Sequence, residues 1–471
     1  MADVCVIGAG PAGSVFAARM AQLGHTVTLV ERARFPRRRL GESLSPGVRP
    51  LLDTVGAREA VESAGLQRVR RVLVHWDGDA HVREDPREEG LLVDRGIFDQ
   101  LLLDRAQSLG VRVLQPARAA ERTTTAQGWT IQIVTETGTI ELRADFLADA
   151  GGRSSGAAQR HRTGCPTLAL YAYWRGSDLP REPRIEAGDN AWYWGVPLPD
   201  GTYNTLIFVD PVEFRATRSG SLHAEFLSRL RRSGLLAGSR DAQQASPVQA
   251  IDATPYLAED YVTATSLRVG EAALAIDPVS SSGVQKAIQS ALAAAIVANT
   301  LLRRPDSVNT SMRFYRANLE DASRRHAHWA AGYYGKVAAE RSSKFWQDRG
   351  AGAEPNPMEQ PKPPLDVHAI TSSAFALSQQ LEFVDLPCIE GDFVVTKGAL
   401  RHPNLDGPIV YLGGQELAPL LRGVRPGLTP MQLAQAWSGR VPLQSGLAIA
   451  GWLVNNELLV PESQPHAHGP A

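Results

Sequence analysis

Lysine is nearly absent from this chain of 471 residues. It occurs at only five positions, and the first of these is Lys286, so the N-terminal half of the chain contains no lysine. Arginine carries almost all of the positive charge, and the net charge is −1. A balance this close to neutral argues against nucleic acid or an anionic membrane surface as a partner. It also excludes any chemistry that needs a lysine ammonium group from the N-terminal half.

Cysteine is equally scarce, and long apolar runs are missing. The three cysteines, Cys5, Cys165 and Cys388, lie far apart and show no spacing typical of a metal site or a disulfide framework. We expect Cys5 to be a small core residue, because it lies inside an apolar run. No apolar stretch approaches the length of a membrane span, and a domain pattern that begins at residue 3 leaves no room for a signal peptide. We therefore expect a soluble, cytoplasmic protein without a metal ion.

The start of the chain carries the pattern around which the rest is organised. An apolar run at 4–7 leads into Gly8-x-Gly10-x-x-Gly13, which is followed by an alanine-rich segment of helical spacing and a second apolar run that stops at Glu31. Gly8 permits a tight turn, Gly10 lets a pyrophosphate approach the backbone, and Gly13 lets helix and strand pack closely. The helix N-terminus offers N–H groups to an anion, and Glu31 is placed to accept hydrogen bonds from a ribose. The pattern predicts dinucleotide binding.

Three further motifs follow in order along the chain. They are FPR at 35–37, GES at 41–43 and a segment of the form GEAA…DP…SSG at 270–283. Together with the glycine pattern they resemble the flavin-dependent monooxygenase and halogenase superfamily, whose fold is that of p-hydroxybenzoate hydroxylase. The resemblance covers about residues 3–345 and implies FAD as the cofactor.

The resemblance implies an α/β fold with several parts. In chain order these are an FAD-binding Rossmann-like domain of the GR2 type at 1–165 and 250–345, an inserted antiparallel-sheet substrate domain at 166–249 that includes part of 70–95, a Pro/Gly-rich linker at 346–364, and a small winged-helix-like α+β domain at 365–460. Periodicity predicts an amphipathic helix at 52–66, and a helix that begins at Phe98. Alternation of apolar and polar residues predicts a hairpin at 128–142.

The positions that match the cofactor-binding motifs of the family come from both ends of the first domain. Those expected to contact FAD are Gly8, Ala9, Gly10, Ala12, Gly13, Glu31, Arg32, Arg39, Glu42, Ser43, Arg95, Ala117, Ala150, Gly151, Gly270, Glu271, Pro278, Gly283 and Val284. The resemblance places Arg95 on the flavin side, and it places the helix that begins near Gly283 where it stabilises negative charge on the reduced flavin. Many related hydroxylases carry aspartate at the position of Gly151. Its absence puts direct oxidation of NAD(P)H in doubt, so the reductant is either NAD(P)H or a separate flavin reductase.

An aromatic motif lies in the substrate domain. The residues Trp192-x-Trp194-x-Val196-Pro197 resemble the WxWxIP signature of flavin-dependent halogenases, in which the tryptophans crowd the flavin. The residues expected to line or shield the substrate cavity are Tyr173, Trp174, Trp192, Trp194 and Pro278. Aromatic residues in strands are usually core, and that interpretation stays open. No catalytic base can be nominated.

Two outcomes of oxygen chemistry are implied by the resemblance. The flavin C4a-hydroperoxide either hydroxylates an electron-rich ring in a dry cavity or reacts with halide to make hypohalous acid. Halogenases of the tryptophan type carry a relay lysine in the N-terminal half, which this chain lacks. We therefore expect a monooxygenase that uses O2 on an aromatic substrate. A halogenase, an ene-reductase like the geranylgeranyl reductases and a non-catalytic flavoprotein remain as alternatives.

The C-terminal segment carries its own pattern. Thr429 followed by Pro430 predicts a capped helix, and a second amphipathic helix follows at 441–453. No Lys or Arg occurs between 442 and 460, so contacts to nucleic-acid phosphates would lack charge. Docking of a protein or peptide, or a structural role, fits better. The whole combination resembles hydroxylases that oxidise a protein tryptophan in tryptophylquinone formation; a small aromatic molecule is the rival substrate.

Overall fold

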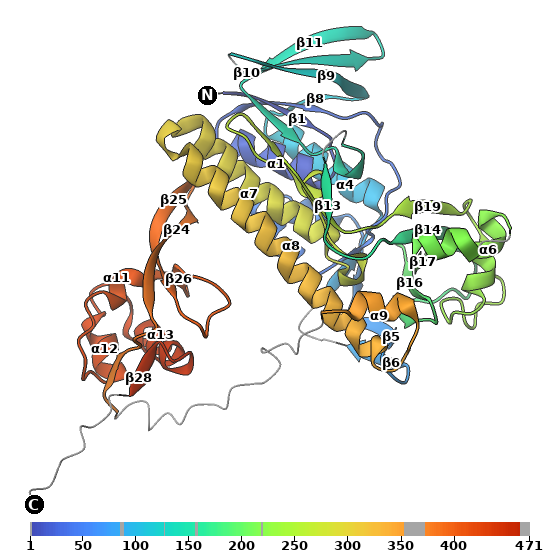
Figure 1. The fold of residues 1–471 in the computed structure, drawn as a ribbon. Coiled ribbons are helices and arrows are strands. Elements are labelled where there is room, and N and C mark those ends of the chain that lie inside the picture. Colours follow the sequence, from blue (N-terminus) through green and yellow to red (C-terminus); the bar gives the residue numbers. More distant parts are fainter. Residues whose placement is uncertain are drawn as a thin grey trace, which may run out of the picture. The chain divides into compact units, whose positions relative to one another are not determined.

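The computed structural model describes residues 2–84, 89–126, 128–155, 159–217, 220–352 and 373–461. The chain divides into two compact units, Met1–Pro355 and Asn356–Ala471 (Figure 1). No helix in the described part of the chain is both long and apolar enough to span a bilayer. Of the predicted linker, the stretch 353–364 lies outside the described residues.

The first unit is built on a parallel sheet of five strands. Their order across the sheet is β21 (Ser266–Arg268), β12 (Phe146–Asp149), β1 (Asp3–Ile7), β2 (Thr26–Val30) and β8 (Arg112–Leu114). Strand β1 lies in the middle, and its residues Val4, Cys5 and Val6 are buried, as the apolar run predicts for a strand covered on both faces. Burial raises the pKa of the Cys5 thiol to about 12, so this residue is an inert core group as expected.

Long helices cover this sheet. Helix α1 (Pro11–Gln22) connects β1 to β2 and packs against α4 (Arg95–Ser108) and α7 (Gly283–Arg303). Helix α8 (Val308–Ala338) runs beside α7 (Figure 1). Four of the twelve buried residues of α7 are alanine, and such small side chains let helices approach closely. A three-stranded antiparallel sheet of β9 (Ala117–Thr125), β10 (Gly128–Thr135) and β11 (Gly138–Ala144) confirms the predicted hairpin.

A second large sheet lies beside the first. Its strands are β18 (Gln243–Gln244), β14 (Leu168–Arg175), β17 (Tyr203–Val209), β16 (Ala191–Pro197), β15 (Arg184–Ala187), β5 (Arg71–His75) and β6 (His81–Glu84), with β19 (Gln249–Asp252) paired to β14. All pairs are antiparallel except β15 with β5. The predicted α/β class with a largely antiparallel second sheet is confirmed.

Short elements connect these layers. They are β3 (Ser43–Leu44), β4 (Gln67–Val69), β7 (Gly90–Leu92), β13 (Arg160–Arg162), β20 (Tyr256–Ala258), β22 (Leu274–Ala275), the helices α5 (Pro211–Thr217) and α6 (Leu222–Leu230), and the 3₁₀ turns η1 (Gly152–Ser154), η2 (Gly270–Ala272), η3 (Pro278–Ser280) and η4 (Pro305–Ser307).

Two predicted helices have different limits in the structure. The helix expected at 52–66 is two helices, α2 (Val48–Val55) and α3 (Arg58–Ser63), because Gly56 adopts φ +69 and ends the first of them. Helix α4 begins at Arg95 rather than at Phe98. The side chain of Asp94 accepts hydrogen bonds from the N–H groups of Gly96 and Ile97 and so caps the helix one turn earlier.

The residues predicted to begin the linker belong to the first unit instead. Helix α9 (Lys344–Gly350) extends past 346. Trp346 is fully buried, its indole N–H donates to the Gly188 carbonyl at 2.9 Å, and its ring meets that of Trp76 edge to face. Composition suggested a linker here, but one large buried aromatic side chain anchors the helix.

The second unit contains three two-stranded ribbons and three described helices. The ribbons are β23 (Phe375–Leu377) with β28 (Leu459–Pro461), β24 (Glu382–Glu390) with β25 (Phe393–Arg401), and β26 (Tyr411–Leu412) with β27 (Gln415–Glu416); the helices are α11 (Ala418–Leu421), α12 (Pro430–Ala436) and α13 (Leu443–Asn455). The two predicted helices are therefore present. Their buried side chains, among them Leu433, Trp437 and Leu453, form a separate core.

The cap of α12 allows a small stability test. The Thr429 hydroxyl accepts from the Gln432 N–H, and the Gln432 side chain accepts from the Thr429 N–H, a reciprocal capping box. We expect Thr429→Ala to lower the free energy of unfolding of this unit by about 1 kcal/mol, whereas Thr429→Ser retains the cap. Hydrogen exchange of the α12 amides measures the difference. Equal protection in the two variants would contradict the expectation.

Candidate active site

The glycine turn after β1 is tightly packed at two of its three glycines. Gly8 has φ +97, and a Cβ placed on it would lie 2.5 Å from the carbonyl oxygen of Ala150. A Cβ on Gly13 would lie 1.8 Å from the carbonyl oxygen of Gly8. Both positions therefore require glycine for the fold itself, the first for its turn and the second for the close approach of α1 to β1.

Gly10 differs, because a Cβ there would meet nothing within 4 Å. It precedes α1, whose first turn has no side-chain cap and no acidic residue. An uncapped helix N-terminus beside open space suits an anion such as a pyrophosphate. Glu31 is buried nearby, and its carboxylate accepts from the N–H groups of Ala9 at 2.7 Å and Ala33 at 2.9 Å. The turn thus fits the phosphate and ribose of a dinucleotide.

The two distant motifs meet in the structure. A Cβ on Gly270, which has φ +60, would lie 2.6 Å from the Cβ of Ala12 in the glycine turn. A Cβ on Gly41 would lie 2.7 Å from a guanidinium nitrogen of Arg95 and 3.2 Å from a methyl group of Val284. Residues from the start of the chain and from 270–284 therefore border one region, as the resemblance predicts.

Several predicted contact residues are held in place by backbone bonds. The Ala117 N–H donates to the Glu31 carbonyl at 2.7 Å, and the Ala150 N–H donates to the Ile7 carbonyl at 2.8 Å. These bonds place the start of β9 and the end of β12 beside the glycine turn. Pro278 opens η3, Gly283 opens α7, and Ser43 opens β3.

The predicted charged residues have different environments. Arg95 is largely buried and binds Asp99 at 3.0 Å and the Leu40 carbonyl, so it joins α4 to the loop that carries GES. Arg32 donates to the Ser154 hydroxyl at 3.0 Å, and Arg39 is exposed. Glu271 is partly exposed and pairs with Arg153 at 3.3 Å.

Glu42 is buried in a cluster that the sequence did not reveal. One carboxylate oxygen accepts from the Tyr173 hydroxyl at 2.7 Å and from the Asn204 side chain at 3.0 Å, and the other accepts from the Gly41 N–H. Burial raises the pKa of Glu42 against these hydrogen bonds. The Glu42 carboxylate therefore ties the GES loop to strands β14 and β17 of the second sheet.

A second buried carboxylate lies at the end of β12. Asp149 pairs with Arg122 at 2.8 Å and with Arg268 at 3.3 Å, and it accepts from the Ser155 hydroxyl and the Gly151 N–H. Burial alone would raise the pKa of Asp149, but the Arg122 charge and these hydrogen bonds outweigh it and lower the pKa. The turn that contains Gly151 is thus fixed by its neighbouring aspartate.

The aromatic residues predicted to line the substrate cavity do not all lie on one face of the second sheet. Tyr173, Trp192 and Trp194 lie on one face of the second sheet, whereas Trp174 packs on the opposite face with the residues beneath α6. Trp174 also donates its indole N–H to the Thr205 hydroxyl at 2.8 Å. The prediction for Trp174 is wrong, because neighbouring residues in a strand point to opposite faces.

Trp192 is a packed residue rather than an open cavity wall. It is 2% exposed, stacks on Phe208 with ring centroids 3.7 Å apart, and meets Trp76 edge to face. Trp76 in turn stacks on Tyr333 of α8. The alternative that aromatic strand residues are core therefore holds for Trp192, while Trp194 is only partly buried.

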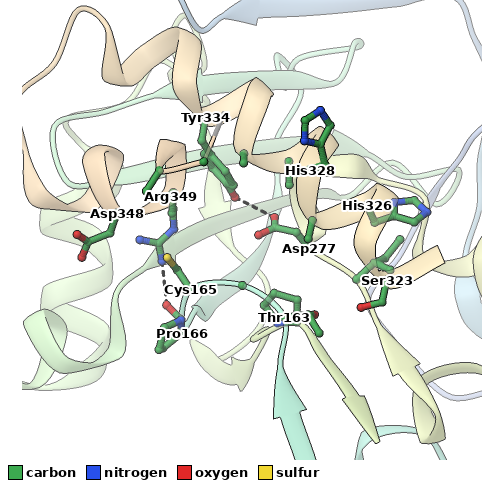
Figure 2. A pocket seen from close by; sticks show the side chains of 18 of the residues that line it. Thr163, Cys165, Pro166, Asp277, Ser323, His326, His328, Tyr334, Asp348 and Arg349 are labelled. Atoms are coloured by element: carbon green, nitrogen blue, oxygen red, sulfur yellow. Dashed lines mark hydrogen bonds between the residues drawn. The ribbon is translucent and has the colours of Figure 1, made fainter. Parts of the chain in front are cut away.

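A cavity of about 470 Å³ lies next to this aromatic core. Figure 2 shows its lining side chains, which come from the loop 163–166, from Asp277 before η3, and from α8 and α9. His326 and His328, which their helical pattern predicts to be surface or interface groups, line it as well. Burial, with the charges of Lys286 and Arg325, lowers the pKa of His326 to about 4, so its imidazole is neutral at pH 7. The cavity volume is within the range of small-molecule sites.

Comparison with known proteins identifies the family. The model described as "FAD binding domain" matches residues 1–174. The tryptophan 2-halogenase of Chondromyces crocatus is 31% identical over 366 residues, which cover 73% of this chain and 69% of the relative. This chain belongs to the FAD-dependent halogenase and hydroxylase family. The flavin-dependent halogenase armH4 of Armillaria mellea is 27% identical over 71% of this chain and 72% of its own.

Solved structures of this family agree with the fold. The peptidyl tryptophan dihydroxylase QhpG, essential for tryptophylquinone cofactor biogenesis, superposes with a TM-score of 0.76 at 27% identity, over 96% of this chain and 98% of its own. The flavin-dependent halogenase CmlS superposes with a TM-score of 0.77 at 21% identity, over 97% of this chain and 95% of its own. The enzyme is a flavin-dependent oxidoreductase, and its cofactor is FAD.

The residues of this flavoenzyme that would hold FAD follow from the geometry above. The space at Gly10 and the start of α1 would take the pyrophosphate, Glu31 the ribose, and the region between Gly41, Arg95 and Val284 the flavin end. Reduced FAD supplies the reaction with O2 that generates the oxidant. The protein's part is to bind FAD, to keep water away from the reacting ring and to place the substrate.

Three residues of these buried clusters were not singled out from the sequence. They are Asn204, Tyr334 and Asp277, the last of which was noted only as part of a motif. Asp277 could have been found from its place between a strand and a proline, where aspartate caps a turn. No sequence signal links Tyr334 to it, because that contact spans 57 positions.

Proposed function

We propose that this enzyme is an FAD-dependent monooxygenase that hydroxylates an electron-rich aromatic ring, namely the tryptophan side chain of a protein or peptide. The observation that carries the proposal is the absence of lysine from the N-terminal half of the chain. A halogenase of the tryptophan type needs an ammonium group to relay the halogenating species. A monooxygenase needs only a dry site in which the ring meets the oxidant.

The positions of the three described lysines of the first unit support this proposal. Lys286 bonds Gln289 of its own helix, Lys336 is exposed, and Lys344 is an exposed residue held by Asp348 at 2.6 Å. None of the described residues that line the cavity is a lysine. Among the described residues, no lysine is therefore placed in the cavity wall to carry a halogen.

The comparisons support a protein or peptide substrate. The peptidyl tryptophan dihydroxylase, which superposes over both units of the chain, is 27% identical to it, whereas the halogenase CmlS, which superposes equally far, is 21% identical. We propose that the second unit docks the substrate, since its helix α13 carries no positive charge for nucleic acid. A small aromatic molecule is the alternative substrate of the same reaction.

Halogenation is the second candidate function. The motif Trp192-x-Trp194-x-Val196-Pro197 and the curated halogenases among the relatives favour it. Chloride or bromide dependence separates the two functions, because only halogenation consumes halide.

The test is a turnover assay with tryptophan-containing peptides under ¹⁸O₂, with and without chloride and bromide. Reducing equivalents come from NADH in one arm and from NADH with a separate flavin reductase in another. We expect product that contains ¹⁸O, at the same rate in all halide conditions. Product that contains halogen, or turnover that stops when halide is removed, would overturn the proposal. Comparison of the two arms identifies the electron donor.

A further inference from the structure

The cavity of about 470 Å³ contains one buried acidic group, Asp277, which lies in the DP…SSG motif but was not among the residues expected to contact FAD. Asp277 is 8% exposed and lies at the start of the turn η3, directly before Pro278. That turn leads into α7, the helix proposed to border the flavin end of the cofactor. A ligand held by Asp277 would therefore lie beside the proposed flavin site.

The two oxygens of the Asp277 carboxylate have different surroundings. Oδ1 accepts from the Val279 N–H at 3.0 Å and from the Tyr334 hydroxyl at 2.9 Å, the latter shown as a dashed line in Figure 2. Oδ2 has no hydrogen-bond partner among the described residues. The two bonds to Oδ1 hold the carboxyl group in place and leave Oδ2 as the acceptor that this cavity-lining residue can offer to a ligand.

Most of the other charged groups around the cavity have partners or are neutral, although Arg349 Nε has no hydrogen-bond partner among the described residues. The Arg349 guanidinium donates to the Pro166 and Phe345 carbonyls and to the Thr167 hydroxyl, and it stacks on the Phe345 ring. His326 is neutral at pH 7, as shown above, and Asp348 pairs with Lys344. The Arg349 charge lies near enough to lower the pKa of Asp277 against the larger effect of burial, but the hydrogen bonds of Arg349 go to other groups than Oδ2.

The walls favour a flat, neutral ligand. The α8 side contributes the small side chains Ala327, Ala330 and Ala331, and Leu274 and Ile276 add apolar surface from the other side. Small apolar walls with a single acceptor suit an aromatic ring that carries one N–H donor. An anionic ligand is disfavoured, because burial already raises the pKa of Asp277 and because Asp348 adds a second carboxyl group to the lining.

We propose that this cavity binds the substrate ring, with a ring N–H of the indole type donating a hydrogen bond to Oδ2 of Asp277. This inference rests on the proposed function for its substrate class. A hydrogen bond from the ring N–H to a carboxylate increases the electron density of the ring, which favours attack by an electrophilic oxidant. Asp277 would thus select indoles and orient the ring toward the proposed flavin site.

The test measures binding to the FAD-loaded full chain without turnover. The probes are N-acetyl-tryptophanamide and its 1-methyl derivative, titrated calorimetrically. We expect the first to bind at least about tenfold more tightly, because the methyl group removes the hydrogen bond and leaves a buried acceptor without a partner. In Asp277→Asn the amide oxygen takes the place of Oδ1 and still accepts from Val279 and Tyr334. The amide NH₂ then replaces Oδ2, so a hydrogen-bond donor stands where the acceptor was. The preference for the N–H probe should then disappear.

Two further variants make the result interpretable. Asp348→Asn removes the other lining carboxylate and should keep the tenfold preference. Ala331→Phe fills the cavity and should abolish binding of both probes while FAD content is unchanged, which tests the cavity even if Asp277→Asn does not fold. Equal affinities of the two probes for the wild type, or binding that survives Ala331→Phe, would overturn the inference.

Binding and turnover together separate the two proposals. If the N–H preference depends on Asp277 but no tryptophan peptide is oxygenated, the cavity assignment stands and the hydroxylase proposal fails. If peptides are oxygenated while Asp277→Asn retains the preference, the hydroxylase proposal stands and the cavity assignment fails.

Discussion

Gly10→Ala should give a folded protein whose affinity for FAD is much reduced. A Cβ at this position meets nothing within 4 Å, and the backbone of Gly10 is extended, so alanine fits without strain. We expect the stability of the FAD-free protein to change by less than about 1 kcal/mol. The added methyl group enters the space in which the pyrophosphate approaches the backbone, so FAD affinity should fall at least about tenfold, or about 1.4 kcal/mol.

Gly13→Ala is the matched control, because it changes the same motif but should destabilise the fold itself rather than FAD binding alone. Its Cβ would lie 1.8 Å from the Gly8 carbonyl oxygen, so α1 must move away from β1. Overpacking against backbone costs about 1–3 kcal/mol or more, even before FAD is added. Urea titration of FAD-free protein and fluorescence titration with FAD measure the two quantities. Equal losses of stability in the two variants, or unchanged FAD affinity in Gly10→Ala, would refute this division of roles.

This pair shows which part of the site could be predicted from the sequence. The glycine turn, the acid at Glu31 and the helix at Gly283 follow from local patterns, because each needs only neighbours within one strand–turn–helix unit. Their meeting, seen at Ala12 and Gly270, was predicted only through the resemblance to a family.

The contacts between distant segments could not be predicted in this way. The bond between Glu42 and Tyr173 spans 131 positions, and no periodicity connects the GES loop to β14. The Asp277–Tyr334 bond likewise depends on how α8 crosses the loop before α7. The error at Trp174 is different, because strand alternation separates it from Tyr173, and the sequence alone could have shown that.

Asp149→Ala should produce the largest loss of stability among the variants considered. The Asp149 side chain is 6% exposed and is shared by Arg122, Arg268, the Ser155 hydroxyl and the Gly151 N–H. Its removal leaves two partly buried guanidinium groups without their common partner, which costs about 3–5 kcal/mol. We expect a value near 3 kcal/mol, because water reaches part of both arginines. Asp145→Ala is the control: this exposed residue accepts one bond from the Asp3 N–H, and its loss should cost about 1 kcal/mol or less.

The pH dependence of this effect follows from the lowered pKa of Asp149. A carboxylate whose pKa is lower in the folded state stabilises the fold above its unfolded pKa of about 3.9, and this contribution is lost as pH falls through the folded pKa. The difference between wild type and Asp149→Ala should therefore be largest above about pH 5 and should shrink in more acid solution. Hydrogen exchange of the β12 and β1 amides across this pH range measures it. A difference that does not change with pH would mean that Asp149 acts through packing, and its ion pairs with Arg122 and Arg268 would then contribute nothing to the fold.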